Sequence, residues 1–74
     1  MRILFFGRLR DGAPAGPVPA GIRDIDALRA WLGRGRPELL DASVRIAVND
    51  EMILGNRVLD DGDEVAFLPP MSGG

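Results

Sequence analysis

The sequence predicts a single small α+β domain in which a sheet of four to five strands is covered on one face by one main helix. Runs of β-branched and aromatic residues near both ends of the chain predict the strands, and one segment between them has the apolar spacing of an amphipathic helix. With 74 residues, the chain is long enough for one hydrophobic core and too short for two. We therefore expect residues 1–74 to form one domain with a flexible C-terminal tail over residues 69–74.

The first strand is predicted over Ile3–Phe6, where apolar residues follow one another without polar alternation. Such a run indicates a central strand with apolar side chains on both faces. The following segment, Gly12–Gly21, is rich in glycine and proline. Because proline cannot donate a backbone hydrogen bond, this segment permits at most a short edge strand around Val18.

The main helix is predicted to begin after Asp24, whose side chain is suited to an N-cap. Gly33 and Gly35 supply C-terminal stops, and Arg34 and Arg36 place positive charge where it suits the end of the helix dipole. This explanation is favoured over a nucleic-acid-binding tract, because no aromatic residues are interleaved with the arginines. The apolar positions at helical spacing are Ile25, Leu28 and Leu32.

The second half of the chain predicts three more strands. Val44–Val48 alternates, Asn49-Asp50 signals a tight turn, and Met52–Leu54 is a short strand. The last strand, Glu64–Leu68, follows an acidic turn over Leu59–Asp63. That turn lacks the ligand spacing of an EF-hand calcium loop, so we expect a solvent-exposed turn and no metal site.

Strand alternation divides the apolar residues between the two faces of the sheet. One set is expected to face the helix: Ile3, Phe5, Val44, Ile46, Val48, Val65 and Phe67. Leu4, Phe6 and Leu68 then lie on the open face, beside the start of the tail. Exposed apolar residues are common on any protein, but their place next to the tail favours a protein-binding surface.

The composition excludes several kinds of chemistry. The chain has no cysteine and no histidine, and all nine basic residues are arginine. Catalysis by this chain alone is therefore not expected, nor is a zinc–thiolate site, a Schiff base or linkage to a copy of itself through lysine. The net charge of −2 disfavours nucleic acid as a partner. The N-terminal apolar run is too short for a signal peptide or a membrane span, so we expect a cytoplasmic protein without a membrane partner.

The functional prediction centres on the last six residues and the free carboxylate of Gly74. Pro69 and Pro70 end strand pairing and send the chain outward. Gly73 and Gly74 lack a Cβ, so they suit a narrow channel in a partner and a close approach to the terminal carbonyl. Extended, the tail reaches at most about 20 Å, which is far enough to enter the active site of another protein.

Several segments resemble the small, sulfur-carrier subunits of molybdopterin synthase, a family of ubiquitin-like sulfur carriers. The resemblance spans nearly the whole chain, and its most specific part is Asp61–Gly74; it also rests on Leu4–Gly7, Arg10-Asp11 and Val48-Asn49. It implies a ubiquitin-like β-grasp fold with a mixed sheet, which agrees with the predicted order of elements. Relative to the family, the 14–19 segment is a poor second strand and residues 33–41 are shortened.

The resemblance implies a carrier cycle centred on Gly74. An E1-like adenylyltransferase would use ATP and magnesium to adenylate this residue, and a sulfur donor enzyme would convert the product to a thiocarboxylate. The loaded tail would then enter the large subunit of the synthase, where sulfur passes to a pterin precursor to form the dithiolene of molybdopterin. On this reading no cofactor binds to the chain itself.

The resemblance also implies which residues meet the large subunit. Phe6, Met52 and Leu68 would pack against it, and Arg10 would pair with an acidic group on it. Ser72, which has no activating base in this chain, is expected to orient the tail. The remaining tail residues expected in the interface are Pro69, Pro70 and Met71.

Three other functions share parts of this pattern. One is a sulfur carrier that serves thiamine or another sulfur-containing product. The second is a ubiquitin-like modifier whose activated carboxylate is joined to lysines of other proteins. The third is an interaction domain whose tail does no chemistry, so that its function would survive deletion of Gly74.

Overall fold

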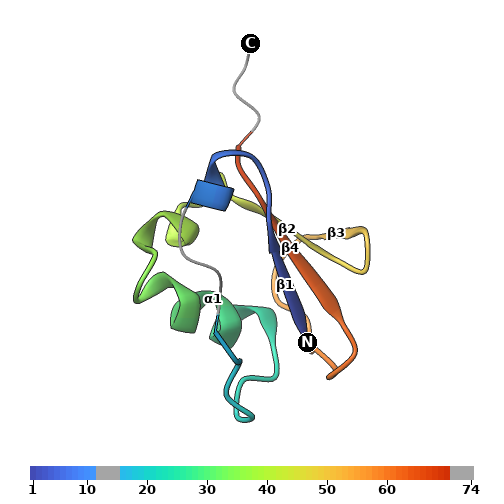
Figure 1. Cartoon of the computed structure of the whole chain (residues 1–74). Helices are drawn as coiled ribbons and strands as arrows, with labels where there is room; N and C mark the ends of the chain where they lie inside the picture. Colours follow the sequence, from blue (N-terminus) through green and yellow to red (C-terminus); the bar gives the residue numbers. More distant parts are fainter. Residues whose placement is uncertain (12–15, 71–74) are drawn as a thin grey trace.

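A computed structural model describes residues 1–11 and 16–70 (Figure 1). Four strands form one sheet in the order β1-β4-β2-β3. β1 runs parallel to β4, whereas β2 is antiparallel to both β4 and β3, so the sheet is mixed as predicted. The elements are β1 (Arg2–Phe5), the 3₁₀ helix η1 (Gly7–Asp11), α1 (Ile25–Gly33), the 3₁₀ helix η2 (Pro37–Leu40), β2 (Arg45–Val48), β3 (Glu51–Ile53) and β4 (Glu64–Leu68).

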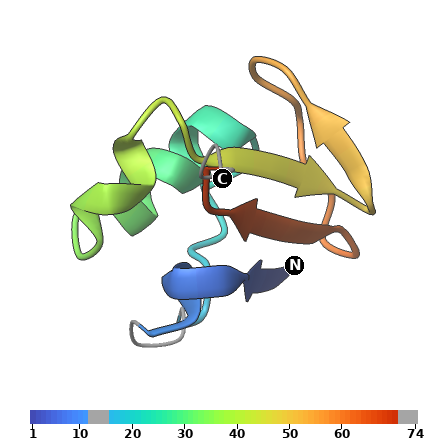
Figure 2. The ribbon, with the colours of Figure 1, turned by 90° about the horizontal axis from the view of Figure 1, so that it is seen from above.

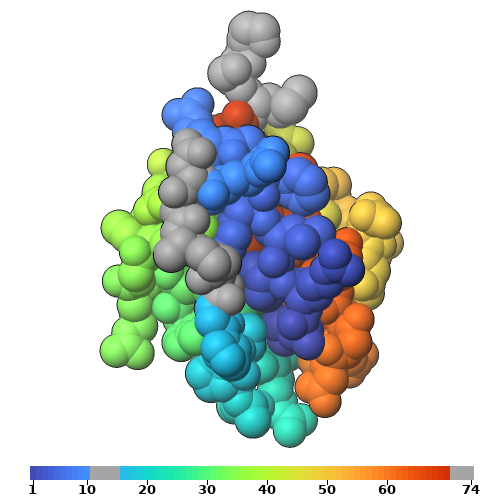
Figure 3. Space-filling view, in the orientation of Figure 1, coloured from blue at the N-terminus to red at the C-terminus, as the bar shows by residue number. Residues whose placement is uncertain are grey.

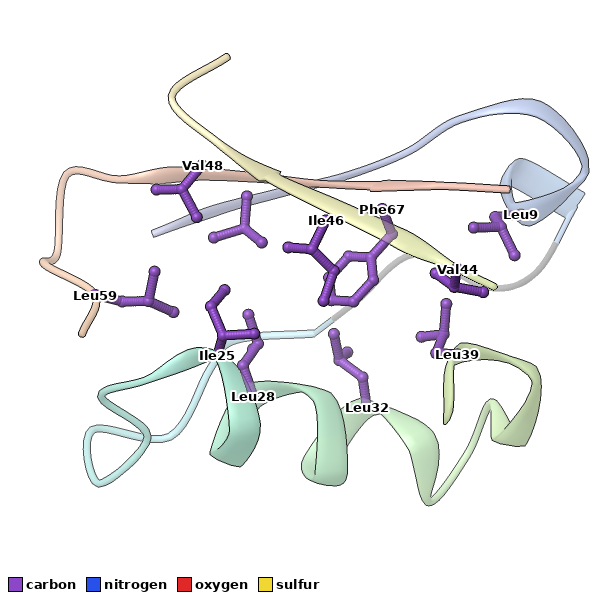
Figure 4. Packing of buried hydrophobic residues seen from close by; sticks show 11 residues of the cluster. Leu9, Ile25, Leu28, Leu32, Leu39, Val44, Ile46, Val48, Leu59 and Phe67 are labelled. Carbon is purple, nitrogen blue, oxygen red and sulfur yellow. The ribbon is translucent and has the colours of Figure 1, made fainter. Parts of the chain in front are cut away.

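α1 and η2 lie on one face of the sheet (Figure 2), and the hydrophobic core fills the space between the two layers (Figure 4). α1 and η2 pack against each other beneath the strands. Phe67, in the centre of the sheet, is fully buried, and its ring centroid lies 5.6 Å from that of Phe5. The buried core comprises Leu9, Ile25, Leu28, Leu32, Leu39, Val44, Ile46, Val48, Leu59, Val65 and Phe67.

The predicted division of the sheet faces is confirmed. All of the helix-facing residues named from the alternation are in the core or packed against it, with Ile3 and Phe5 partly buried. On the other face, Leu4 and Leu68 are half-buried and Phe6 is exposed. The alternation was a reliable guide because only one face of the sheet is covered by helices. A shift of a strand by one residue would move its apolar side chains from the covered face to the open one, so the register is fixed.

Two local predictions are also confirmed. The Asp24 carboxylate accepts a hydrogen bond of 2.8 Å from the Ala27 amide and so caps α1. Asn49 and Asp50 form the β2–β3 turn with φ angles of 51° and 69°. Both values lie in the left-handed region that a two-residue hairpin turn needs, and asparagine and aspartate tolerate that region better than most residues.

The end of α1 differs from the prediction that Gly33 and Gly35 act as stops. Neither glycine has a positive φ; Arg34 is still helical, and the chain leaves through bonds such as Gly35 amide to Leu32 carbonyl, 3.2 Å. Gly33 is instead required by packing, since a Cβ there would lie 2.6 Å from the Leu40 side chain. Close contact between α1 and η2, rather than backbone conformation, explains this glycine.

Arg36 also does more than place charge near the end of α1. Its guanidinium lies 4.2 Å from the centre of the Phe5 ring, and Nη2 donates a hydrogen bond to the Leu9 carbonyl. Nε lies 3.5 Å from a Glu38 carboxylate oxygen. The side chain therefore connects the loop after α1 to β1 and η1, on the far side of the core.

Residues 16–20 form no strand, so in the described part of the chain nothing pairs with the outer edge of β1. The prediction that the first strand is central is therefore wrong, because β1 is an edge strand and β4 and β2 lie in the middle of the sheet. The prolines in this segment explain the difference from a five-stranded sheet, because each removes a backbone donor. Val18 still packs against the core as a partly buried side chain. Among residues 1–11 and 16–70, no helix is long and apolar enough to cross a membrane.

Candidate functional site: the tail exit and the open sheet face

The tail leaves from the end of the sheet at which β1 and β4 both finish. This end is called here the exit end. Because these two strands are parallel, η1, which follows β1, and Pro69-Pro70, which follow β4, are brought together there (Figure 1). The Phe6 amide donates a 3.0 Å hydrogen bond to the Phe67 carbonyl, which extends the pairing of the two strands to this end. The predicted outward exit of the chain thus begins beside η1.

Gly7 and Pro69 are in contact at the exit end. Gly7 has a φ of +58°, and a Cβ placed on it would lie 2.6 Å from Cγ of Pro69. In the space-filling view the blue surface of η1 meets the red residues at the end of β4 (Figure 3). A side chain on residue 7 would therefore require a shift in either η1 or the base of the tail.

The open face of the sheet is apolar at its centre. The strand register places Leu4, Ala66, Ala47 and Met52 in one row across the sheet. Alanines in the middle of this row leave a shallow surface between the larger side chains at its ends. Phe6 and Met52 are 44% and 50% exposed, so large apolar groups remain available to a partner.

The structure places three of the predicted partner-binding residues on this face. Phe6 continues the alternation of β1, Leu68 ends β4, and Met52 lies at the far end of the Leu4 row. Phe6 and Leu68 are next to the exit of the tail, whereas Met52 is on the opposite edge strand. Their arrangement fits one continuous contact surface.

Positive charge gathers near the exit end. Arg8 and Arg10 lie in η1, and Arg45 is paired with Leu68 across β2 and β4. All three are exposed, and none takes part in the ion pairs found among the described residues. Their charges are therefore available to acidic groups on another molecule. The pairing of Arg10 with such a group stays a prediction.

The opposite end of the sheet, where β4 begins, is called here the turn end. It carries the acidic residues before β4. Asp63 accepts hydrogen bonds from the Asp60 amide at 2.8 Å and from the Asn49 side chain at 2.9 Å. The first of these bonds is the main cause of a lowered pKa for Asp63. Within the described residues, no group of three or more acidic side chains converges as a metal site would require.

Sequence reasoning missed Gly7, Arg36 and Arg45 as residues of this site. The only local signal for Gly7 was its position directly after a strand. It also missed an open groove beside α1 and β3, which Pro70 lines together with Arg29, Arg45 and Ile53. The predicted tail residues Met71, Ser72, Gly73 and Gly74 lie outside the described residues.

Comparison with known proteins gives consistent matches over the whole chain. Residues 3–74 match the ThiS family. The molybdopterin synthase sulfur carrier subunit of Escherichia coli K12 is 36% identical, with 100% of this chain and 99% of that protein covered. The protein of the same name from Mycobacterium tuberculosis H37Rv is also 36% identical, with 100% of this chain and 96% of that protein covered.

Among solved structures, the complex of subunits 1 and 2 of molybdopterin-converting factor from Helicobacter pylori 26695 contains a similar chain. The TM-score is 0.67 at 35% identity, and the match covers 97% of this chain and 95% of that chain. This likeness agrees with the mixed sheet and single α-helix described above and with the predicted β-grasp fold. The chain therefore belongs to the ThiS family, and its fold is that of the matching chain in the complex of subunits 1 and 2 of molybdopterin-converting factor.

Proposed function

We propose that this chain is the sulfur carrier subunit of a molybdopterin synthase and that the C-terminal carboxylate of Gly74 carries the sulfur. The observation that supports this most strongly is the 36% identity, over the full chain, to two proteins named as that subunit. The sequence Pro69–Gly74 ends the chain with the two glycines that such an arm needs. Identity over the whole length argues against a shared fold with an unrelated tail.

The chemistry begins with activation of the terminal carboxylate. A carboxylate is ionised at neutral pH and is a poor electrophile until one oxygen becomes part of a good leaving group. An E1-like adenylyltransferase with ATP and magnesium forms the acyl adenylate and releases pyrophosphate. A sulfide-level donor then forms a C–S bond while the C–O bond to AMP breaks, which leaves a thiocarboxylate on Gly74.

The loaded tail next delivers its sulfur inside the large subunit to a pterin precursor. The open face, with Phe6, Met52 and Leu68, is the surface proposed to pack against that subunit. Support comes from their shared face and exposure, and from the Helicobacter pylori complex, which holds two subunits of molybdopterin-converting factor. The basic residues around Arg10 suit acidic groups at the rim of such an interface.

The test is the intact mass of the protein after incubation with ATP, magnesium, an adenylating enzyme and a sulfur donor. We expect a mass gain equal to the exchange of one oxygen for sulfur, mapped to Gly74, and no gain in a variant that lacks Gly74. With an adenylating enzyme shown to be active on a known carrier, no mass gain would contradict the proposal.

The same sample separates this function from its alternatives. Addition of the large subunit and a pterin precursor should consume the thiocarboxylate and regenerate the original mass. A carrier for thiamine or another product would load sulfur but keep it in this second step. A protein modifier would instead appear in cell extracts with Gly74 in amide linkage to lysines of other proteins.

A further inference from the structure

We propose that Gly7 is a positioning residue that sets the direction in which the tail leaves the sheet, by giving Pro69 a backbone surface to rest on. This inference rests on the proposed function only for its consequence, the delivery of sulfur; the geometric part stands without it. The argument begins with how firmly η1 is held.

The segment that carries Gly7 is fixed on both sides. Before it, the Phe6 amide bonds to the Phe67 carbonyl at 3.0 Å; after it, the Leu9 amide bonds to the Phe6 carbonyl at 3.1 Å. Leu9 itself is buried in the core. These contacts hold the first turn of η1 against the end of β4.

Arg36 holds the same segment from the other side. It stacks 4.2 Å over the Phe5 ring and donates to the Leu9 carbonyl, and its side chain is only 11% exposed. Burial of a guanidinium away from water is costly unless it gains such contacts. η1 therefore lies between two independent attachments, and the backbone of Gly7 cannot easily move away from Pro69.

The Gly7–Pro69 contact leaves no room for a side chain. A Cβ on residue 7 would come within 2.6 Å of Cγ of Pro69, closer than non-bonded carbon atoms approach, and within 3.3 Å of Cδ, which is a tight contact. Because η1 is fixed, the shift would fall on Pro69. The ring of Pro69 also restricts its φ, so it transmits the contact to the chain that follows.

The consequence is largest at the end of the tail. Five residues of sequence lead from Pro69 to Gly74, and a chain of that length reaches at most about 17 Å when extended. Over that reach, a small change of direction at the base amounts to several ångströms at the far end. For a sulfur that must reach a substrate inside a partner, misplacement of about 1 Å can cost about a hundredfold in rate. The packing of Pro69 against Gly7 thus restricts the range of positions that the end of the tail can take.

Gly7→Ala is the direct test, and Gly55→Ala is its matched control. Gly55 also has a positive φ, +85°, but a Cβ there meets nothing within 4 Å. Both variants carry the strain of alanine in the left-handed region, and only Gly7→Ala adds the contact with Pro69. A third variant, Pro69→Ala, removes Cγ and Cδ and so removes the overlap.

The first readout is the position of the tail, measured on the full chain without any partner. A spin label on Ser72→Cys, in a protein without other cysteines, broadens NMR signals of the residues that the tail visits. We expect Gly7→Ala to change this broadening pattern, Gly55→Ala to leave it unchanged, and the Gly7→Ala effect to disappear in the Pro69→Ala background. Identical patterns for Gly7→Ala and Gly55→Ala would overturn the proposal.

Pro69→Ala also tests the contact by itself, so the proposal can be checked even if Gly7→Ala does not fold. It introduces no strain and adds no atom to the core, so it should fold. Loss of the contact with Gly7 should spread the broadening over more residues. An unchanged pattern would overturn the proposal as well.

The second readout is single-turnover sulfur transfer from the loaded tail within the synthase. We expect Gly7→Ala to lower the transfer rate by about tenfold to a hundredfold, with affinity for the large subunit within about twofold of the original. Gly55→Ala should keep the original rate, and an equal loss in both variants would overturn the positioning role. If the unchanged protein loads no sulfur at all, the proposed function fails, whereas the label experiment still decides the role of Gly7.

Discussion

The two ends of β4 are fixed by different kinds of interaction. At the turn end, Asn49 bridges β2 and β4: its side chain accepts from the Glu64 amide at 3.0 Å and donates to Asp63. At the exit end, where prolines provide no donors, Pro69 rests against Gly7 by packing alone. The difference teaches that side-chain hydrogen bonds from Asn49 fix the start of β4. At the other end, the lack of a side chain on Gly7 determines how Pro69 packs and in which direction the chain continues.

These two ends should also respond differently to substitution. Changes at the turn end should lower the free energy of unfolding and leave partner binding intact. Changes to exposed groups at the exit end should leave the free energy of unfolding nearly unchanged, because these groups contribute little to the core. They should instead impair partner binding at Phe6 and sulfur transfer at Gly7.

The largest expected effect is at the exit end. Phe6→Asp should weaken binding of the large subunit by about thirtyfold or more, since loss of a central aromatic anchor typically costs about 2 kcal/mol. The protein should stay folded, because Phe6 is already 44% exposed. Gel filtration with the large subunit and a thermal melt of the free protein measure the two quantities.

The matched control for that change is Val58→Asp. Val58 is 74% exposed and forms an isolated bridge with Asp24, away from the tail exit, so it takes the same charge without touching the proposed interface. A complex that survives Phe6→Asp, or that is lost equally in Val58→Asp, would contradict the proposed contact surface.

At the turn end, Asn49→Ala should lower the free energy of unfolding by about 1–3 kcal/mol, because it removes two side-chain hydrogen bonds. Asp50→Ala is the control: residue 50 has a similar positive φ, 69°, and its side chain makes no hydrogen bond among the described residues. Urea unfolding should therefore show a smaller loss for Asp50→Ala, and sulfur loading should be unchanged in both. Equal losses would show that backbone strain, not the bridge, accounts for the effect.

The smallest effect concerns pH. The Asp60 amide and the Asn49 side chain lower the pKa of Asp63 from its ordinary value of 3.8. A carboxyl group whose pKa is lower in the folded protein stabilises it above the unfolded value, and this contribution is lost as the pH falls below about 4. Asp63→Asn should therefore flatten the acid side of the stability curve relative to the original protein. An unchanged difference between the two proteins from pH 6 to pH 3 would contradict this assignment.

Much of the fold could be predicted because its determinants are local. The alternation of Val44–Val48, the Asn49-Asp50 turn and the Asp24 cap each act within a few residues, and each is found in the structure. For the candidate site, Phe6 and Leu68 could be placed on one face for the same reason, whereas Met52 was expected in the interface only from the resemblance to the family. Their role in binding, like that of Arg10 and of the tail, remains a prediction.

The sequence by itself determined the strands, the single helix, the apolar faces and the abrupt exit at Pro69-Pro70, because period, capping and proline chemistry are read within one segment. The roles of Gly33, Arg36 and Gly7 became clear only from the tertiary structure. Arg36 reaches a carbonyl 27 residues away, and each glycine is required by a side chain from a different element. Contacts of this kind depend on how the chain packs in three dimensions, which no local pattern specifies.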